Sequence, residues 1–521
     1  MNQFPGVRME TELKLLLDPA DVAVFRRHPL LRRYALARPV PQQLTSIYFD
    51  TPDGYFRRHD AGLRVRLVQR QWIQTLKADG QVAAGLHQRQ EWESPVAGAV
   101  PDLAALADLV GAHGKWGRRL RKSGLGAQLE PIFTTRFKRT LWQLRLEHGE
   151  EVELVLDQGE IVHADARLPI SEIELELKSG DPAGLFAFAL QLQQAVPLRV
   201  GNISKAERGY ALLAPQAPTV AVAARLLLAP DLSVEQGLQA IVGNCLAQIQ
   251  GNEDGVMHGS DPESVHQMRV GLRRLRCASG LFARLAPCPA ALQIELKWLL
   301  GILGAARDWE VFSGTLDTLA DAGPVPAQWD ALQQAAHRLA HRHRRRAGLA
   351  LGSVRYAAFL LALGSWLHSA RGSPEQGDQG WASPLADFAA NTLQKCHRTL
   401  KKRVKRLQDD TPQARHRVRI AAKKLRYSSE FFQSLYRPKR MRAYLKALSG
   451  LQDRLGRLND VAVAGRLLGR LAHSHPELAY SAGLVHGYLE ARTESAIRTL
   501  GRRGRQCMPG KIPALQSPHK Y

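Results

Sequence analysis

The sequence predicts an α+β protein in which a closed β-sheet with a charged interior is followed by an all-helical half. Three observations lead to this prediction. Short strands with alternating charged and apolar residues fill the first 213 residues, the β pattern stops at prolines between 214 and 230, and one amphipathic helical segment then occurs twice. Strands grouped in one part of a chain and helices in another are typical of separate β and α domains.

The first predicted strand is Met9–Leu15, with the sequence Met-Glu-Thr-Glu-Leu-Lys-Leu. Alternate side chains of a strand point to opposite faces, so Glu10, Glu12 and Lys14 share one face. Two carboxylates and an ammonium group suit a divalent metal and a phosphate, because hard cations prefer carboxylate oxygens and phosphates prefer cationic donors. Many strands carry a charged, solvated face, so this stretch alone is a weak signal.

The same pattern returns at Ile173–Lys178, where Glu174, Glu176 and Lys178 share a face. Charged residues also recur on the strands in between, in Leu63–Leu67 with Arg64 and Arg66, in Thr75–Lys77, in Glu91–Glu93, in Thr134–Arg136 and in Glu151–Asp157. Such a face is too costly to bury unpaired in an apolar core. We therefore expect the sheet to close around a wet, ion-filled interior, with its apolar side chains outside and under covering helices.

Taken together, these segments resemble the CYTH domain of the triphosphate tunnel metalloenzymes, over residues 1–213. The resemblance rests on the segments above and on Tyr48-Phe49-Asp50-Thr51, Asp157 and Ser204-Lys205-x-x-Arg208-Gly209-Tyr210. It implies an eight-stranded antiparallel tunnel that binds a triphosphate together with Mg²⁺ or Mn²⁺.

Under this resemblance, phosphoanhydride hydrolysis needs cations along the phosphate oxygens and a positioned water. The residues expected to take part in catalysis are Glu10, Glu12, Lys14, Lys77 and Arg136. The residues expected to bind the phosphates are Arg64, Arg66, Lys77, Arg136, Lys178 and Lys205. The expected metal ligands are Glu10, Glu12, Asp157, Glu174 and Glu176, with Glu91 and Glu93 as further candidates for ligands or for orienting water.

Length and composition limit the remaining possibilities. A chain of 521 residues is too long for one compact core, so at least two domains are expected. A net charge of +24 implies a polyanionic partner, which can be nucleic acid, a phosphate polymer or an anionic membrane surface. The five scattered cysteines indicate reduced thiols and a cytoplasmic setting. The sequence shows no signal peptide and no apolar run of 18 residues, so neither a membrane span nor a membrane partner is expected.

Along the chain, Asp-Pro pairs at 18–19 and 181–182 predict helix starts, because Asp caps helices and Pro fits the first turn. A further helix is expected over Pro101–Gly111. We place a CYTH domain at 1–213, a linker at 214–230, a helical domain at 231–503 and a disordered tail at 504–521.

The helical half contains an internal repeat, residues 265–282 and 415–432. In the first copy the basic side chains recur at helical spacing and form one stripe, with Met268 and Leu275 on the opposite side. A basic run is usually a solvated face. Here the stripe contains almost no acids and its spacing occurs twice, so two cationic helices are expected to converge on one polyanion. A second repeated pair, Leu303–Asp308 and Leu455–Asp460, follows the two copies.

This half resembles the CHAD domain, over about residues 231–500. The resemblance implies two four-helix bundles from a duplicated unit, with a basic groove for inorganic polyphosphate. The matching residues are His266, Arg269, Arg273, Arg274 and Arg276 in the first copy, and His416, Arg419, Lys423, Lys424 and Arg426 in the second. The basic segments His337–Arg346 and Lys395–Arg406 either line the same groove or form a solubilising surface.

These features predict an inorganic triphosphatase, similar to bacterial inorganic triphosphatases, that also binds polyphosphate. One alternative is a non-catalytic, granule-associated polyphosphate-binding protein. Others are an adenylate cyclase of the CYTH type and a thiamine or nucleoside triphosphatase, although the sequence shows no pocket for an organic group. Base-stacking aromatics are not arrayed in the sequence, so no specific nucleic-acid partner is expected. A cytoplasmic location, with association to polyphosphate granules, is the corresponding expectation.

Overall fold

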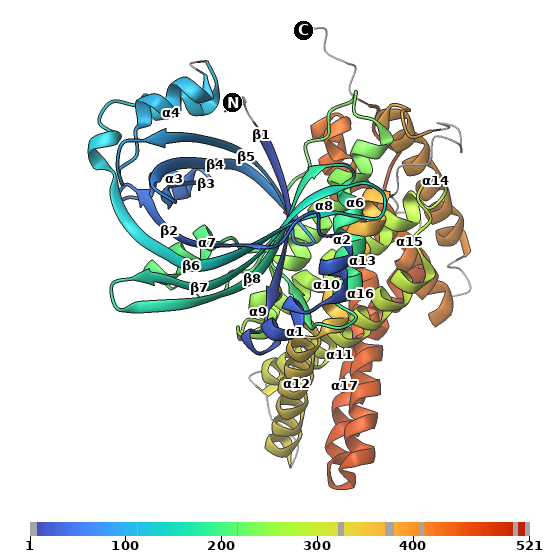
Figure 1. The fold of residues 1–521 in the computed structure, drawn as a ribbon. Coiled ribbons are helices and arrows are strands. Elements are labelled where there is room, and N and C mark those ends of the chain that lie inside the picture. The colour runs from blue at the N-terminus through green and yellow to red at the C-terminus, as the bar shows by residue number, and fades with distance from the viewer. Residues whose placement is uncertain are drawn as a thin grey trace. The chain divides into compact units, whose positions relative to one another are not determined.

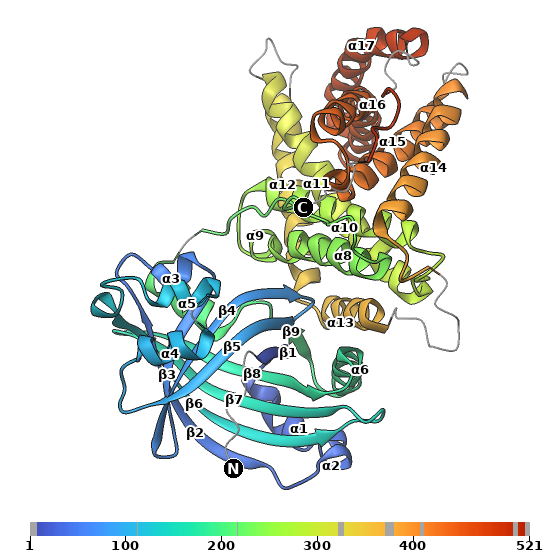
Figure 2. The same cartoon turned by 90° about the horizontal axis from the view of Figure 1, so that it is seen from above.

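The computed structural model describes residues 8–111, 113–215, 217–320, 328–369, 380–406, 411–503 and 509–515. The chain forms two compact units (Figures 1 and 2). The first unit comprises the chain up to Ala217 together with Gly352–Ser369, and the second comprises Pro218–Leu351 and the chain from Ala370 onward.

In the described part of the first unit, eight strands form a closed antiparallel barrel, so the predicted closure of the sheet is confirmed. The strands are β1 (Arg8–Leu17), β2 (Val40–Asp50), β3 (Ala61–Val68), β4 (Gln71–Ala83), β5 (Leu86–Val96), β6 (Glu130–Arg145), β7 (Glu151–His163) and β8 (Ala166–Ser179). Their order is β5-β4-β3-β2-β6-β7-β8-β1, and β1 pairs back onto β5 to close the barrel (Figure 1).

Strand β1 occupies the closing position because it is shared between partners. Its residues 8–13 pair with β5, its residues 12–16 pair with β8, and its last three residues pair with the short β9 (Leu198–Val200). The register sets Glu12 opposite Glu176 and Lys14 opposite Glu174. The two copies of the Glu-x-Glu-x-Lys pattern therefore lie side by side on the interior face.

Apolar side chains of the barrel point outward and are covered by helices, as expected. The helical elements of this part are η1 (Pro19–Asp21), α1 (Val22–Arg26), α2 (Pro29–Tyr34), α3 (Tyr55–Arg58), α4 (Leu103–Val110), α5 (Lys115–Leu120), η2 (Gly126–Gln128), α6 (Pro182–Leu192) and α7 (Lys205–Leu213). Leu63 and Trp92 of the sheet share a buried cluster with Leu106 of α4 and Trp116 of α5. Asp18 and Asp181 cap η1 and α6 as predicted, each with a Pro in the first turn.

Helix α13 (Val354–Ser369) belongs to the barrel unit, although it lies within the range predicted for the helical domain. It packs against α6, where the rings of Phe186 and His368 stack with centroids 5.6 Å apart. A Cβ at Gly364 would lie 2.2 Å from a ring carbon of Phe186, so this close packing requires glycine. The barrel unit is thus completed by a segment that follows it by more than 130 residues.

The second unit is all-helical, as predicted. Its elements are α8 (Val234–Gln250), α9 (Glu253–Met257), α10 (Pro262–Leu281), α11 (Ala290–Ala320), α12 (Trp329–Leu351), α14 (Leu385–Lys405), α15 (Pro412–Phe431), η5 (Gln433–Leu435), α16 (Pro438–Ser474), η6 (Pro476–Leu478) and α17 (Ala479–Arg503). Helices α8, α10, α11 and α12 pack in succession, and α14, α15, α16 and α17 repeat that order. One buried cluster joins Trp309 and Leu316 to Leu332 and Leu467.

Two segments predicted to lie outside the domains are fixed to the helical unit. In the predicted linker, Ala221 exchanges two hydrogen bonds with the Asn252 side chain, and Leu228 exchanges two with Ser434. Residues 509–515 lie within the predicted disordered tail, yet Leu515 forms a β-bridge with Tyr436. Residues 504–508 and 516–521 of the predicted tail lie outside the described residues.

Within the described ranges, none of the helices taken singly has both the length and the apolar character needed to cross a membrane, and one bent pair, α12 with α13, meets the test jointly.

Candidate functional site

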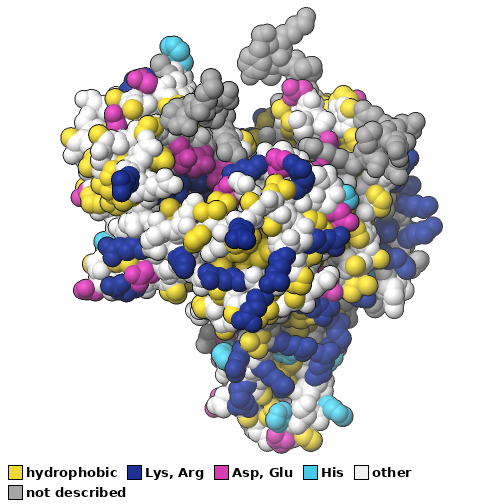
Figure 3. Space-filling view, in the orientation of Figure 1, with side chains coloured by type: hydrophobic (Ala, Val, Ile, Leu, Met, Phe, Trp, Pro, Cys, Tyr) yellow, Lys and Arg dark blue, Asp and Glu magenta, His cyan; other side chains and the backbone are white. Residues whose placement is uncertain are grey.

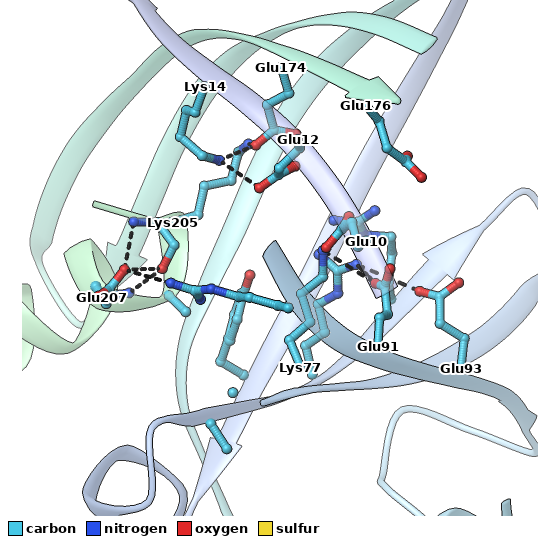
Figure 4. A pocket seen from close by; sticks show the side chains of 18 of the residues that line it. Glu10, Glu12, Lys14, Lys77, Glu91, Glu93, Glu174, Glu176, Lys205 and Glu207 are labelled. Carbon is cyan, nitrogen blue, oxygen red and sulfur yellow. Dashed lines mark hydrogen bonds and ion pairs between the residues drawn. The ribbon is translucent and has the colours of Figure 1, made fainter. Parts of the chain in front are cut away.

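The barrel encloses a cavity of about 320 Å³ that is lined mostly by charged side chains (Figure 4). Most of the predicted tunnel residues line it, namely Glu10, Glu12, Lys14, Arg64, Arg66, Lys77, Glu91, Glu93, Glu174, Glu176, Lys178 and Lys205. Asp157 is fully buried behind this wall and is held by Arg139 and Lys205. In Figure 3 the opening of the barrel shows carboxylates beside Lys and Arg side chains.

A buried carboxylate group lies at one end of the cavity and consists of Asp157, Glu172 and Glu174. One oxygen from each lies within 4.8 Å of the others, so the group has the spacing of a metal site. Each carboxylate already has cationic partners, however. Glu174 accepts from Lys14, from Lys205 at 2.8 Å and from Arg139 at 3.0 Å, while Arg208 and Lys205 hold Glu172.

The attraction between these acids and their cationic partners affects the pKa values of Glu174 and Lys14. Burial alone would raise the pKa of Glu174, but Lys14, Lys205 and Arg139 together hold it well below its ordinary value. Burial would likewise lower the pKa of Lys14, and Glu12, Glu172 and Glu174 instead raise it well above the usual range. Four cations, Lys14, Lys205, Arg139 and Arg208, therefore contact the three acids.

This network predicts that the barrel loses stability in acid. The pKa of Asp157 and that of Glu174 are lowered in the folded state, so their stabilisation is present above the ordinary values of 3.8 and 4.5 and is lost as the pH falls below them. Urea unfolding midpoints measured from pH 6 down to about 3 should fall, and Asp157→Asn should flatten that fall. Glu160→Gln, which removes an exposed acid paired with Arg167, should keep the wild-type slope. An equal slope in Asp157→Asn would contradict the network.

A second row of carboxylates crosses the cavity wall and has fewer cations. Glu12, Glu176 and Glu153 are direct cross-strand neighbours on β1, β8 and β7. Like charges placed directly opposite repel. Lys178 contacts Glu176 at 2.5 Å and Glu153 at 3.7 Å, yet burial still raises the pKa of Glu176. This row carries a surplus of negative charge, which an added divalent cation would offset.

The opposite wall holds a mixed set of charges from β3, β4 and β5. Lys77 contacts Glu10 at 2.5 Å and Glu91 at 3.3 Å, and Arg64 lies 3.7 Å from both Glu91 and Glu93. Burial opposes the charge on Lys77, but Glu10 and Glu91 raise its pKa above the ordinary value. Glu10 is thus engaged by a lysine rather than grouped with the buried acids.

Arg66 has little neutralising charge close to it in this cavity. Its Nε donates to Ser46 Oγ at 2.8 Å and its guanidinium lies over the Phe137 ring, and no carboxylate of the described chain lies within 4.0 Å of it. Burial, together with Arg64 and Arg139, lowers the pKa of Arg66 to about 9. A guanidinium with this surplus of positive charge is suited to an incoming phosphate.

The prediction for Arg136 is wrong, because its side chain is exposed and does not line the cavity. Phe137 lies inside instead, with Arg66, Arg139 and Lys205 over its ring, so the odd-numbered residues of this part of β6 face inward. The β6 arginine of the cavity is Arg139. Strand parity counted from Phe137 could have identified it.

Sequence reasoning missed Glu172, Arg89 and Arg208 as site residues. It placed Glu153 on a charged strand face with Glu151 and Asp157 but did not assign it to the site. Arg89 lines the cavity and pairs with Glu207 at 3.4 Å. Glu172 shares a face with Glu174 by parity and could have been found from it.

Helix α7 places Lys205 inside the barrel. Its N-terminus has a capping box in which the Ser204 side chain accepts from the Glu207 amide and Glu207 accepts from the Ser204 amide. Asp50 anchors the other end of the helix, because its carboxylate accepts from the Tyr210 hydroxyl at 2.7 Å and from two amides of α3. Asp50 and Tyr210 are therefore positioning residues.

In the helical unit, the two predicted cationic stripes come together on α10 and α15. Cys277 Sγ of α10 lies 3.7 Å from the Lys424 carbonyl of α15, so the two helices are neighbours. Arg269, Arg273, Arg419 and Lys423 form what we call the central cluster. Burial and the nearby arginines lower the pKa of Lys423 to about 7, and the same two causes act on Arg419.

The repeated segments Leu303–Asp308 and Leu455–Asp460 each supply a hydrogen-bond acceptor to the central cluster. Arg269 donates to Asp308 at 3.1 Å, and Arg419 donates to Asn459 Oδ1 at 3.1 Å. The Nε atoms of Arg273 and Arg419 are buried, and neither has a hydrogen-bond partner among the described residues. The cluster therefore carries more positive charge and more donors than the chain itself satisfies.

Not every predicted basic residue belongs to this cluster. Arg274 is buried on the other side of α10, where it donates to Gln248 at 2.8 Å and to Asn244 at 2.7 Å. Lys424 is exposed over a separate cavity beside α14. Arg426 pairs with Glu430 at 3.2 Å. His266 is half-buried with a lowered pKa caused by burial and Arg307, whereas His416 and Arg276 are exposed.

Both halves of the chain match known domain families. A family model of the CYTH domain matches residues 8–210, and one of the CHAD domain matches residues 240–469. An inorganic triphosphatase of Haemophilus influenzae is 34% identical over 204 residues, which cover 39% of this chain and 54% of that protein, so the chain spans about half the length of this relative. The crystal structure of the CHAD domain from the plant Ricinus communis is 41% identical, with a TM-score of 0.53, and the match covers 57% of this chain and 99% of that one.

Proposed function

We propose that this chain, which joins a CYTH domain to a CHAD domain, is a metal-dependent inorganic triphosphatase whose helical unit binds inorganic polyphosphate. The products would be pyrophosphate and phosphate. The likeness to the Haemophilus influenzae triphosphatase supports the reaction class, and the attachment to a basic helical unit favours an inorganic polyanion over an organic triphosphate.

The proposal for the barrel rests on one observation. A poorly neutralised arginine, Arg66, and a row of acids lie across from each other in the same enclosed cavity. A linear polyanion needs cations along its length, and a divalent ion needs carboxylates beside it. The cavity offers both, at about 320 Å³, without an apolar pocket for a base or a thiazole ring.

The acids of the second row, Glu12, Glu176 and Glu153, would hold the divalent ion, with Glu10 beside them. Mg²⁺ or Mn²⁺ in this place would act as a Lewis acid on phosphate oxygens and lower the pKa of a bound water. The buried group of Asp157, Glu172 and Glu174 would keep its cations and serve to fix Lys14, Lys205 and Arg139 in place.

The chain's own cations would then grip the substrate. Arg66 and Arg64 from β3 would bind phosphate oxygens on one wall, with Lys77 beside them. Lys14, Lys205 and Arg139 would neutralise the other end of the anion. Interactions that strengthen as charge develops on the leaving phosphate lower the barrier, so these groups act by electrostatic stabilisation. Lys178, already bound to Glu176, would adjust as the metal enters.

An assay of several triphosphates tests the substrate. Purified protein with Mg²⁺ or Mn²⁺ should release phosphate from inorganic triphosphate faster than from ATP or thiamine triphosphate. Binding without release would support the non-catalytic alternative, and cyclic AMP formed from ATP would support the cyclase alternative.

The central cluster predicts salt-dependent binding of polyphosphate. Arg273→Gln combined with Lys423→Gln should weaken binding about 10-fold or more, and log affinity should fall linearly with log salt concentration for every variant, with a shallower slope in this one. Fluorescence anisotropy of end-labelled polyphosphate in EDTA measures both. Lys439→Gln removes an exposed cation at the start of α16 and should change neither the affinity nor the salt slope. Equal affinity in the double variant would contradict the assignment.

A further inference from the structure

A second basic surface lies in the helical unit, in a groove of about 810 Å³ between α12 and α16. We call it the α12–α16 groove. One wall carries Arg338 and Arg342 from α12, and the facing wall carries Arg466 and Arg470 from α16. Figure 3 shows Lys, Arg and His side chains gathered over the part of the molecule where Figure 1 draws α12 and α17.

The positive charge of this groove is not balanced by nearby acids. Its lining contains no Asp or Glu, and within the described ranges no carboxylate lies within 4.0 Å of the four guanidiniums. All four side chains are exposed, so a ligand can reach them. Arg344, by contrast, points to another face of α12, where Glu310 at 2.9 Å and the Gly255 and Gly259 carbonyls bind it.

The spacing of the arginines suits a linear polyanion. On each wall the two arginines are four residues apart, which places them on one face of the helix with a rise of about 6 Å between them. Guanidinium groups bind phosphate through two donors at once. Two such rows facing each other would hold successive phosphates of a chain that runs along the groove.

The groove also continues from the central cluster. Asn459, which accepts from Arg419, lies seven and eleven residues before Arg466 and Arg470 on α16, so all three share one face of that helix. The distance along the axis from Asn459 to Arg470 is about 16 Å. On α11, Asp308 binds Arg269 of the central cluster, and its neighbour Trp309 lines the groove.

We propose that the α12–α16 groove is a second binding segment for inorganic polyphosphate, which extends the central cluster into one continuous track. The ligand class rests on the proposed function of the helical unit. A phosphate polymer is favoured over single-stranded nucleic acid because base recognition needs exposed aromatic rings. Trp309, the aromatic residue in the lining, is 3% exposed and has the His343 ring stacked on it at 6.2 Å.

The test compares two lengths of end-labelled polyphosphate on the full chain, in EDTA so that no hydrolysis occurs. One probe is shorter than the 16 Å track, about five phosphates, and the other is many times longer. The groove variant replaces Arg338, Arg342, Arg466 and Arg470 with Gln. It should bind the long probe about 10-fold more weakly and the short probe as the wild type does.

A charge-matched control replaces four exposed cations at the start of α16, namely Lys439, Arg440, Arg442 and Lys446, with Gln. It should bind both probes as the wild type does. If this control weakens long-probe binding as much as the groove variant does, the effect is net charge and the proposal fails. It also fails if the groove variant keeps wild-type affinity for the long probe, or loses affinity only for single-stranded DNA.

The central variant Arg273→Gln with Arg419→Gln separates this proposal from the one it rests on. It should weaken both probes. If it weakens neither while the groove variant weakens the long probe, the central assignment is wrong and the groove stands. If polyphosphate binds to none of the proteins, the proposed function of the helical unit fails and the groove proposal fails with it.

Discussion

Replacing Arg66 with Ala should lower phosphate release from inorganic triphosphate about 100-fold while leaving thermal stability equal to or above that of the wild type. The loss is expected because removal of one preorganised charge at a reacting anion typically costs a factor of about 100 to 1,000. Stability should not fall, because Arg66 is crowded by Arg64 and Arg139 and no described carboxylate within 4.0 Å depends on it. Steady-state rates and calorimetric melting measure the two effects.

Two further arginine variants serve as comparisons for Arg66→Ala. Arg136→Ala removes an exposed arginine from strand β6 and should change neither rate nor stability. Arg139→Ala should lower both, because it leaves Asp157 with a buried charge and one cation fewer. If Arg66→Ala were as active as the wild type, or if Arg136→Ala were the inactive variant, the assignment of the cavity would be wrong.

Replacing Glu176 with Gln should raise the metal concentration needed for half-maximal activity at least about 10-fold, and the maximal rate should fall as well. Glu176 lies between Glu12 and Glu153, so the substitution removes one negatively charged ligand from the middle of the row. Because burial raises the pKa of Glu176, neutralising it should cost the fold little. Titration of activity with Mn²⁺, and of Mn²⁺ binding by calorimetry, measures the change.

Glu160→Gln is the control for Glu176→Gln, because Glu160 lies on β7 and forms an exposed pair with Arg167. Its metal titration should match that of the wild type. An unchanged metal requirement in Glu176→Gln, with a large change in Glu172→Gln, would instead move the ion to the buried carboxylate group.

Much of the barrel could be predicted from strand parity. Glu10, Glu12 and Lys14 lie on the cavity wall. Side chains alternate between the two faces of a strand, so when the apolar face packs under helices the charged face must point into the barrel. The same argument placed Arg64 and Arg66. It failed at Arg136 because a motif was used in place of the alternation around Phe137.

Other features depend on contacts that are remote in sequence. Nothing local distinguishes α13 from its neighbours, since its place in the barrel unit is set by Phe186 and His368, which are 182 positions apart. Arg274 belongs to the same basic run as Arg273, and only the positions of Asn244 and Gln248 on α8 show that it is a buried structural residue. The α12–α16 groove likewise needs arginines that are remote in sequence, since Arg342 and Arg466 are 124 positions apart.

The most direct test of the account is a crystal structure of the protein with Mn²⁺ and a non-hydrolysable imido analogue of triphosphate. We predict anomalous density beside Glu176 and Glu12, and analogue oxygens within hydrogen-bond distance of Arg66 inside the barrel. Manganese within the group of Asp157, Glu172 and Glu174, or the analogue bound on the outer face beside Arg136, would contradict it.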